Sequence, residues 1–163
     1  MNCPNCGGPM ELVEARAYFH CPFCECIAFP DDSDASADGV VALGSTGRFD
    51  CPVCRQRLAE GAIDGSRVLT CSRCRGLLLN NDEFLLIIGQ RRTLSEKPPR
   101  KAKPIDPEEL KRNLDCPVCA GSMEVHPYYG PGNVVIDSCG RCKVLWLDHG
   151  EFAAIETAPS PNW

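Results

Sequence analysis

The cysteines of this chain are the residues whose type and spacing could do chemistry. The chain has 163 residues and 13 Cys, and twelve of these Cys form six C-x-x-C pairs. Taken two at a time, the pairs are separated by 14, 16 and 19 residues. The last two gaps lie in the range of about 15–20 residues that four-cysteine zinc sites use, and the first is one residue short. The sequence therefore predicts three zinc ions, bound by Cys3, Cys6, Cys21 and Cys24, by Cys51, Cys54, Cys71 and Cys74, and by Cys116, Cys119, Cys139 and Cys142.

Disulfide bonds are the alternative use of so many cysteines. They are typical of secreted proteins. The start of this chain, from Met1 to Pro4, enters a C-x-x-C motif at once, without a basic segment or an apolar run. No stretch approaches the ~18 consecutive apolar residues of a transmembrane helix. We therefore expect a cytoplasmic protein whose reduced thiols bind metal.

Four thiolates satisfy the tetrahedral preference of zinc, so such a site has no open position for a catalytic water. The same four thiolates can also hold iron. We find no nucleophile or acid–base constellation among the other side chains, and we expect no enzyme activity. The thirteenth cysteine, Cys26, aligns with the non-ligands Gly76 and Val144 and is expected to be a small buried residue. Trp146 is likewise expected in the core.

The segments between paired motifs predict β-hairpins. In the second module, Asp64-Gly65 forms a tight-turn signal between two apolar segments. Each of the last two modules then continues with a short strand and a helix. Asn80 and Asp148 occupy the expected N-cap positions, with a Glu three residues later, as in a capping box. The predicted fold class is small, metal-stabilised and β-rich, with three tandem zinc ribbons of three antiparallel strands each and short helices after modules two and three.

The third module carries a family resemblance. Its motif is Cys116-Pro117-x-Cys119, then Cys139-x-x-Cys142, then Leu145-Trp146-Leu147-Asp148-x-Gly150-Glu151. This motif resembles the transcription-factor-IIB-type zinc finger family, a group of small prokaryotic zinc-ribbon proteins. The second module departs from that pattern at Leu78, where the family favours Trp, and at Asp82, where it favours Gly. The first module matches only in its cysteines and a short strand. The resemblance implies zinc-bound ribbons and a loose tie to transcription proteins.

The chain divides into modules and linkers by composition. The first ribbon is a truncated copy, because Pro30 and an acidic tract replace its helix. Both linkers are polar, so we expect the modules to behave as separate units. The predicted boundaries are ribbon one at 1–29, an acidic flexible linker at 30–48, ribbon two with its helix at 49–90, a basic linker with a short helix at 91–114, ribbon three with its helix at 115–157, and a loose tail at 158–163.

The net charge bears on partners. Twelve thiolates and three Zn²⁺ would change the formal charge of −5 to about −11. Such a charge opposes nonspecific binding to nucleic acid. The leading hypothesis is therefore a non-enzymatic adaptor that binds another protein, with a tie to transcription. One alternative is a nucleic-acid-binding regulator that uses the basic linker and the arginines of module two. Another is a thiol redox or metal-handling protein.

Overall fold

The computed structural model describes residues 1–13, 18–24, 27–28, 36–128 and 132–159. Cys26, the turn of the first predicted hairpin, residues 30–35 of the acidic linker and the end of the tail lie outside the described residues. The strands are β1 (Glu11–Val13), β2 (Tyr18–His20), β3 (Ile27–Ala28), β4 (Val41–Asp50), β5 (Arg57–Ile63), β6 (Ser66–Thr70), β7 (Leu77–Asn80), β8 (Glu124–Pro127), β9 (Val135–Cys139) and β10 (Val144–Leu147). The helices are α1 (Asn81–Leu94), the 3₁₀-helix η2 (Glu109–Lys111) and α2 (Glu151–Glu156).

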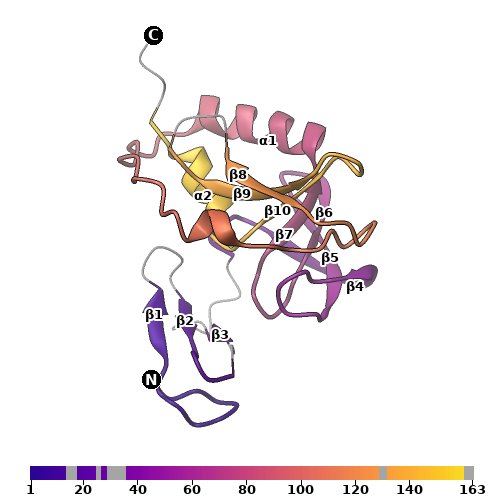
Figure 1. Ribbon diagram of the computed structural model, residues 1–163. Coiled ribbons are helices and arrows are strands. Elements are labelled where there is room, and N and C mark those ends of the chain that lie inside the picture. The colour runs from indigo at the N-terminus through magenta and orange to yellow at the C-terminus, as the bar shows by residue number, and fades with distance from the viewer. Residues whose placement is uncertain (14–17, 25–26, 29–35, 129–131, 160–163) are drawn as a thin grey trace.

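The strands form two antiparallel sheets. The first ribbon has a sheet of its own, in the order β1-β2-β3, and Figure 1 shows it as a small lobe below the rest of the chain. The second and third ribbons share a seven-stranded sheet in the order β4-β5-β6-β7-β10-β9-β8. The hairpin predicted at Asp64-Gly65 is confirmed, because both residues have positive φ and join β5 to β6.

The shared sheet corrects the expectation of three separate three-stranded ribbons. Strand β7 of the second module pairs with β10 of the third, with Leu78 opposite Trp146. Both strands are apolar, and unpaired they would expose backbone groups and side chains at a sheet edge. Pairing the two edges buries them. The second and third modules are therefore not separate units joined only by a polar linker, because these strands bring them into direct contact.

Helices α1 and α2 cover one face of this sheet, and the cysteines of modules two and three lie on the other. Leu77 and Leu147 belong to a buried cluster with Phe84 of α1 and Phe152 of α2. Successive side chains of a strand point to opposite faces of the sheet, so Leu78, adjacent to Leu77, and Trp146, adjacent to Leu147, point away from the helices. Leu78 and Trp146 accordingly pack among cysteines of both modules. Trp146 is fully buried, as the sequence predicts.

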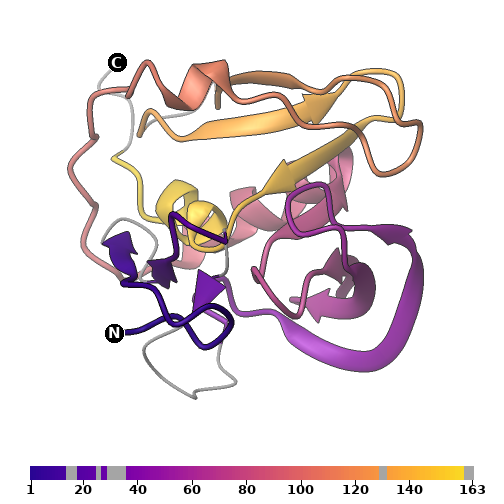
Figure 2. The same cartoon turned by 60° about the horizontal axis from the view of Figure 1, so that its bottom comes forward.

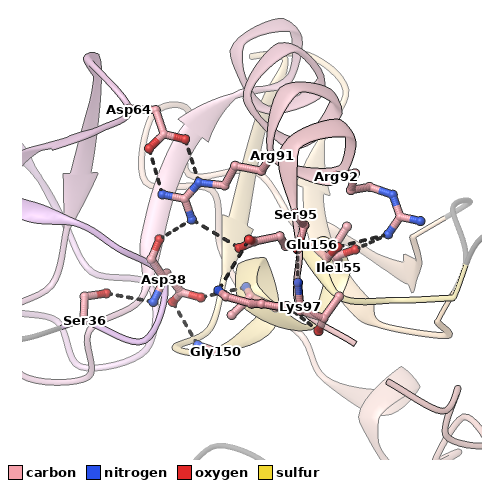
Figure 3. A network of polar contacts seen from close by, with 12 residues as sticks. Ser36, Asp38, Asp64, Arg91, Arg92, Ser95, Lys97, Gly150, Ile155 and Glu156 are labelled. Atoms are coloured by element: carbon pink, nitrogen blue, oxygen red, sulfur yellow. Dashed lines mark hydrogen bonds and ion pairs between the residues drawn. The ribbon is translucent and has the colours of Figure 1, made fainter. Parts of the chain in front are cut away.

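Both predicted linkers contribute to the folded unit. Residues 41–50, largely inside the expected flexible segment, form the edge strand β4. At the start of the basic linker, Arg91 lies in the last turn of α1, where it donates to both carboxylate oxygens of Asp64 and to the main-chain oxygen of Asp38 (Figure 3). The expected short helix is reduced to the single turn of η2. Among the described residues, no helix has the length and apolar character needed to cross a bilayer.

The two helix starts differ, although their sequences align. Asn80 caps α1 as predicted, and its side chain accepts a hydrogen bond from the Asp82 amide. Asp148 does not cap α2, because its carboxylate accepts from Arg112 and from the Trp146 indole instead. Only the reverse half of the expected capping box forms, in which Glu151 accepts from the Asp148 amide at 2.8 Å.

The missing cap comes from a residue far away in the chain. The carboxylate of Asp38, fully buried, accepts from the amides of Gly150 and Ala153 at 2.9 and 3.0 Å. Burial raises the pKa of Asp38, while these two amides, His149 and Arg91 act in the opposite direction. Asp38 thus anchors the segment that follows the first ribbon onto the third module. Figure 2 shows this ribbon lying to one side of β4–β7.

Candidate metal centres

The twelve paired cysteines converge in three groups of four. Within each group the Sγ atoms all lie within 4.8 Å of one another. The groups are Cys3, Cys6, Cys21 and Cys24; Cys51, Cys54, Cys71 and Cys74; and Cys116, Cys119, Cys139 and Cys142. These are the three sets that the spacing predicts. Each group takes two sulfurs from one C-x-x-C turn and two from the next.

Sulfur–sulfur distances test whether zinc fits these groups. The Cys3–Cys24, Cys51–Cys74 and Cys119–Cys139 pairs are separated by 3.5, 3.6 and 3.7 Å. Zinc–sulfur bonds of about 2.3 Å in a tetrahedron place the sulfurs about 3.8 Å apart. A disulfide would require about 2.05 Å. The distances fit a metal and not a disulfide, and none of these twelve cysteines forms a disulfide bond.

A repeated backbone turn presents the sulfurs. In the turn that starts at Cys51, the Cys51 amide donates to Gln56 and the Arg55 amide donates back to the Cys51 carbonyl. The same two hydrogen bonds recur in the turns that start at Cys3, Cys71 and Cys116. They hold the chain in a tight loop, so the two cysteines of each motif project toward the same point.

The residue after the second cysteine of a turn has an unusual conformation. Its φ is positive at Gly7, Arg55, Arg75, Ala120 and Lys143, with values of 74°, 61°, 57°, 60° and 53°. Only glycine adopts this region without strain. The strained geometry allows the next amide to point at a sulfur, as Gly121 does toward Cys119. The positive φ costs conformational energy, and the hydrogen bond that it permits stabilises the negative charge of the thiolate.

The pKa values of the cysteine thiols within a site are shifted in opposite directions. The Gly121 amide and the neighbouring sulfurs lower the pKa of Cys119 to about 7. At Cys3, burial opposes ionisation, but amides and neighbouring sulfurs still lower the pKa to about 6. Burial and adjacent sulfurs raise the pKa of Cys142 to about 12. Four close thiolates repel one another, so they cannot all be ionised without a counter-charge. A divalent cation at their centre supplies that charge.

The second and third sites lie on one hydrophobic cluster. Cys51, Cys71, Cys116 and Cys139 are buried there together with Trp146. The first site has a separate small cluster, which contains Cys3, Cys21 and Met10. Zinc at the second and third sites would therefore stabilise the same hydrophobic cluster, and zinc at the first site would stabilise the first ribbon alone.

Two contributors to this arrangement escape prediction from the sequence. Asp38 falls in an acidic tract, and its partners are backbone amides more than a hundred positions away, so no local signal marks it. Arg112 falls in the basic linker, yet it pairs with Asp137 at 3.6 Å and with Asp148. Although burial disfavours the charged form, these carboxylates raise the pKa of Arg112.

Comparison with known proteins supports the zinc assignment. Residues 50–89 and 115–157 each match the family model described as transcription factor zinc-finger. The matches cover the second and third modules. No curated protein and no solved structure matches the chain. Together, the family match and the three cysteine groups identify three sites positioned to bind zinc.

Proposed function

The chain belongs to the transcription factor zinc-finger family, and on that premise we propose that it is a non-enzymatic zinc-ribbon adaptor that binds another protein in a transcription-related role. The zinc ions would be structural. Each site offers four thiolates, which fill the coordination sphere of zinc and leave no position for a substrate or a catalytic water. Closed sites of this kind contribute folding energy and not chemistry.

An exposed apolar face on α1 carries the proposal. Leu85, Leu86 and Leu94 are 48%, 60% and 79% exposed. With Gly89 and Thr93 they line a shallow apolar groove on the helix surface. Exposed apolar patches on a folded chain commonly mark protein contacts. A phosphate backbone would gain nothing from leucines at this place.

Four of the basic residues that the sequence offers to nucleic acid have partners within the chain. Arg91 is engaged by Asp64 and Glu156, and Lys97 also pairs with Glu156. Arg92 donates to the main-chain oxygen of Ile155. In module two, Arg57 pairs with Asp50 at 3.3 Å. Phosphate binding depends on free cationic side chains, so these contacts favour the adaptor over the regulator.

Affinity capture with the tagged, zinc-loaded chain tests the proposal. We expect specific protein partners whose recovery is unchanged by nuclease. Substituting Leu86→Arg and Leu94→Arg should abolish their recovery. Leu110→Arg is the matched control, because Leu110 is a 40% exposed leucine of η2 on another surface.

Two results would contradict the adaptor. One is loss of the captured proteins on nuclease treatment. The other is submicromolar binding to generic duplex DNA or RNA at about 200 mM salt, since a steep salt dependence should remove weak phosphate contacts at that concentration. Reduction of insulin by the zinc-loaded protein would instead favour the thiol redox alternative.

A further inference from the structure

The first zinc site differs from the other two in its exposure to solvent. All twelve paired cysteines lie in the part of the chain that the structure describes, and Cys6 is the only one of them that is exposed. Its equivalents in modules two and three are Cys54 and Cys119, and both are half-buried against the hydrophobic cluster that those modules share. A small oxidant in solution therefore has its most direct access at Cys6.

Cys6 also has a second sulfur within reach. Its Sγ lies 3.5 Å from the Sγ of Cys21, which is fully buried. The other two ligands of the site, Cys3 and Cys24, form an equally close pair at 3.5 Å. Cysteines that are sensitive to oxidation are thiolates that solvent can reach and that lie beside a resolving cysteine. A zinc site supplies the thiolate character, because zinc binds cysteine in its deprotonated form.

Little besides the metal stabilises the first ribbon. Its strands have three, three and two residues. Among the described residues, its buried cluster contains Cys3, Met10 and Cys21, so two of the three members are zinc ligands. The second and third sites lie instead on a cluster with ten buried members, in a seven-stranded sheet. Loss of metal from the first site would therefore unfold the first ribbon and leave the shared sheet intact.

We propose that Cys6 is a peroxide-reactive site, and that its oxidation releases one zinc ion and unfolds the first ribbon alone. The Cys6 thiolate attacks one oxygen of a peroxide, the O–O bond breaks, and a sulfenic acid and hydroxide form. The Cys21 thiolate then attacks the sulfenic sulfur, so that an S–S bond forms, the S–O bond breaks and a second hydroxide leaves. Two protons from solvent convert the two hydroxides to water. The two thiolates together lose two electrons, and one hydrogen peroxide gains them.

The disulfide and the metal cannot occupy the site together. Joining Cys6 to Cys21 removes two of the four ligands. A disulfide also requires a sulfur–sulfur distance of about 2.05 Å, whereas two sulfurs on one tetrahedral zinc lie about 3.8 Å apart. A second peroxide then joins Cys3 to Cys24 by the same steps. This chemistry needs no partner protein, so it does not depend on the proposed adaptor function.

Addition of hydrogen peroxide to the reduced, zinc-loaded full chain tests the proposal. A chromogenic chelator measures zinc release, and differential alkylation with mass spectrometry identifies the oxidised cysteines. We expect one ion per chain to be released at least tenfold faster than the other two, with Cys6 and Cys21 oxidised first. Amide NMR signals of the first ribbon should be lost while those of the shared sheet remain. Without peroxide, the chelator should remove this ion at least tenfold more slowly.

Cys6→His exchanges the reactive sulfur for an imidazole that still binds zinc. This variant should retain three ions per chain and slow the fast release at least tenfold. Cys26→Ser is the matched control, because Cys26 is a cysteine of the same module that lies outside the C-x-x-C pairs. It should leave the fast release unchanged.

Several results would overturn the proposal. They are a fast release that is absent or that occurs equally without peroxide, earlier oxidation of the cysteines of modules two or three, and a three-zinc Cys6→His variant that releases its ion as fast as the unmodified chain. Slowing by Cys26→Ser to the same extent would also overturn it. If Cys6→His binds fewer than three ions, the order of oxidation in the unmodified chain decides, because that order does not depend on the variant.

Discussion

Loss of one ligand from the third zinc site should unfold the second module as well. Replacing Cys119 with Ser removes one of the four sulfurs that close this site. Strand β10 follows the last two ligands directly, and it is the only link between β7 and β9 in the described sheet. When the third module loses its metal, β7 becomes an unpaired apolar edge.

The magnitudes support this outcome. A structural zinc contributes about 10–16 kcal/mol of apparent free energy, and a domain has a net stability of only about 5–15 kcal/mol. Strand β7 holds Leu77, Leu78 and Leu79, which are 0%, 4% and 3% exposed. Full exposure of three leucines would cost roughly 5–9 kcal/mol. This upper limit is comparable with the whole stability of the second module.

Amide NMR spectra and zinc analysis of Cys119→Ser would measure the effect. We expect the native signals of modules two and three to disappear together, with one zinc ion per chain retained by the first ribbon. Cys24→Ser is the matched control, because its site lies in a separate sheet and cluster. It should lose only the first module and retain two ions. Native signals from module two in Cys119→Ser would refute the coupling through β7 and β10.

Three further predictions concern single contacts. Asp38→Ala should reduce the free energy of unfolding by about 2–4 kcal/mol in denaturant titrations, because two backbone amides lose a charged acceptor. The control is Asp106→Ala, which removes an exposed carboxylate that accepts from one backbone amide. It should change the free energy of unfolding by at most about 1 kcal/mol. Gly76→Ala should lower the melting temperature sharply, since its Cβ would lie 2.2 Å from the Trp146 ring, and adding Trp146→Leu should recover part of the loss. If the double variant is as unstable as the sum of the two single variants, the clash is not the cause. Ala120→Gly should stabilise the zinc-loaded chain by up to about 1 kcal/mol, because φ is 60° at this position; destabilisation would show that the turn is not strained.

Local features of the fold could be predicted because their causes are local. The C-x-x-C turns depend on hydrogen bonds between residues four or five positions apart, as from Arg55 to Cys51. The β5–β6 hairpin depends on two adjacent residues, Asp64 and Gly65, with positive φ. The Asn80 cap reaches an amide two residues away. Each of these signals is contained in a short window of sequence.

The wrong expectations share a different cause. Asp148 has the right type and position for an N-cap, but within its own window the Trp146 indole already donates to its carboxylate. Arg112 competes from 36 positions away, together with the Trp146 indole. Likewise, residues 41–50 look like a polar linker, and they become a strand only because β5 offers an edge. Competition among distant partners decides such cases.

The sequence by itself determined the metal chemistry: twelve thiols, grouped in fours by their spacing, with turns that direct them toward three points. It also determined the local strands and the start of α1, because these elements depend on side-chain alternation and nearby hydrogen bonds. Only the tertiary structure decided that two ribbons become one sheet and that Asp38 caps a helix of another module. The physical reason is that edge pairing and burial depend on which surfaces meet, and the residues that meet here lie far apart in the chain, 64 to 70 positions for the β7–β10 pairs and 112 to 115 positions for the Asp38 contacts.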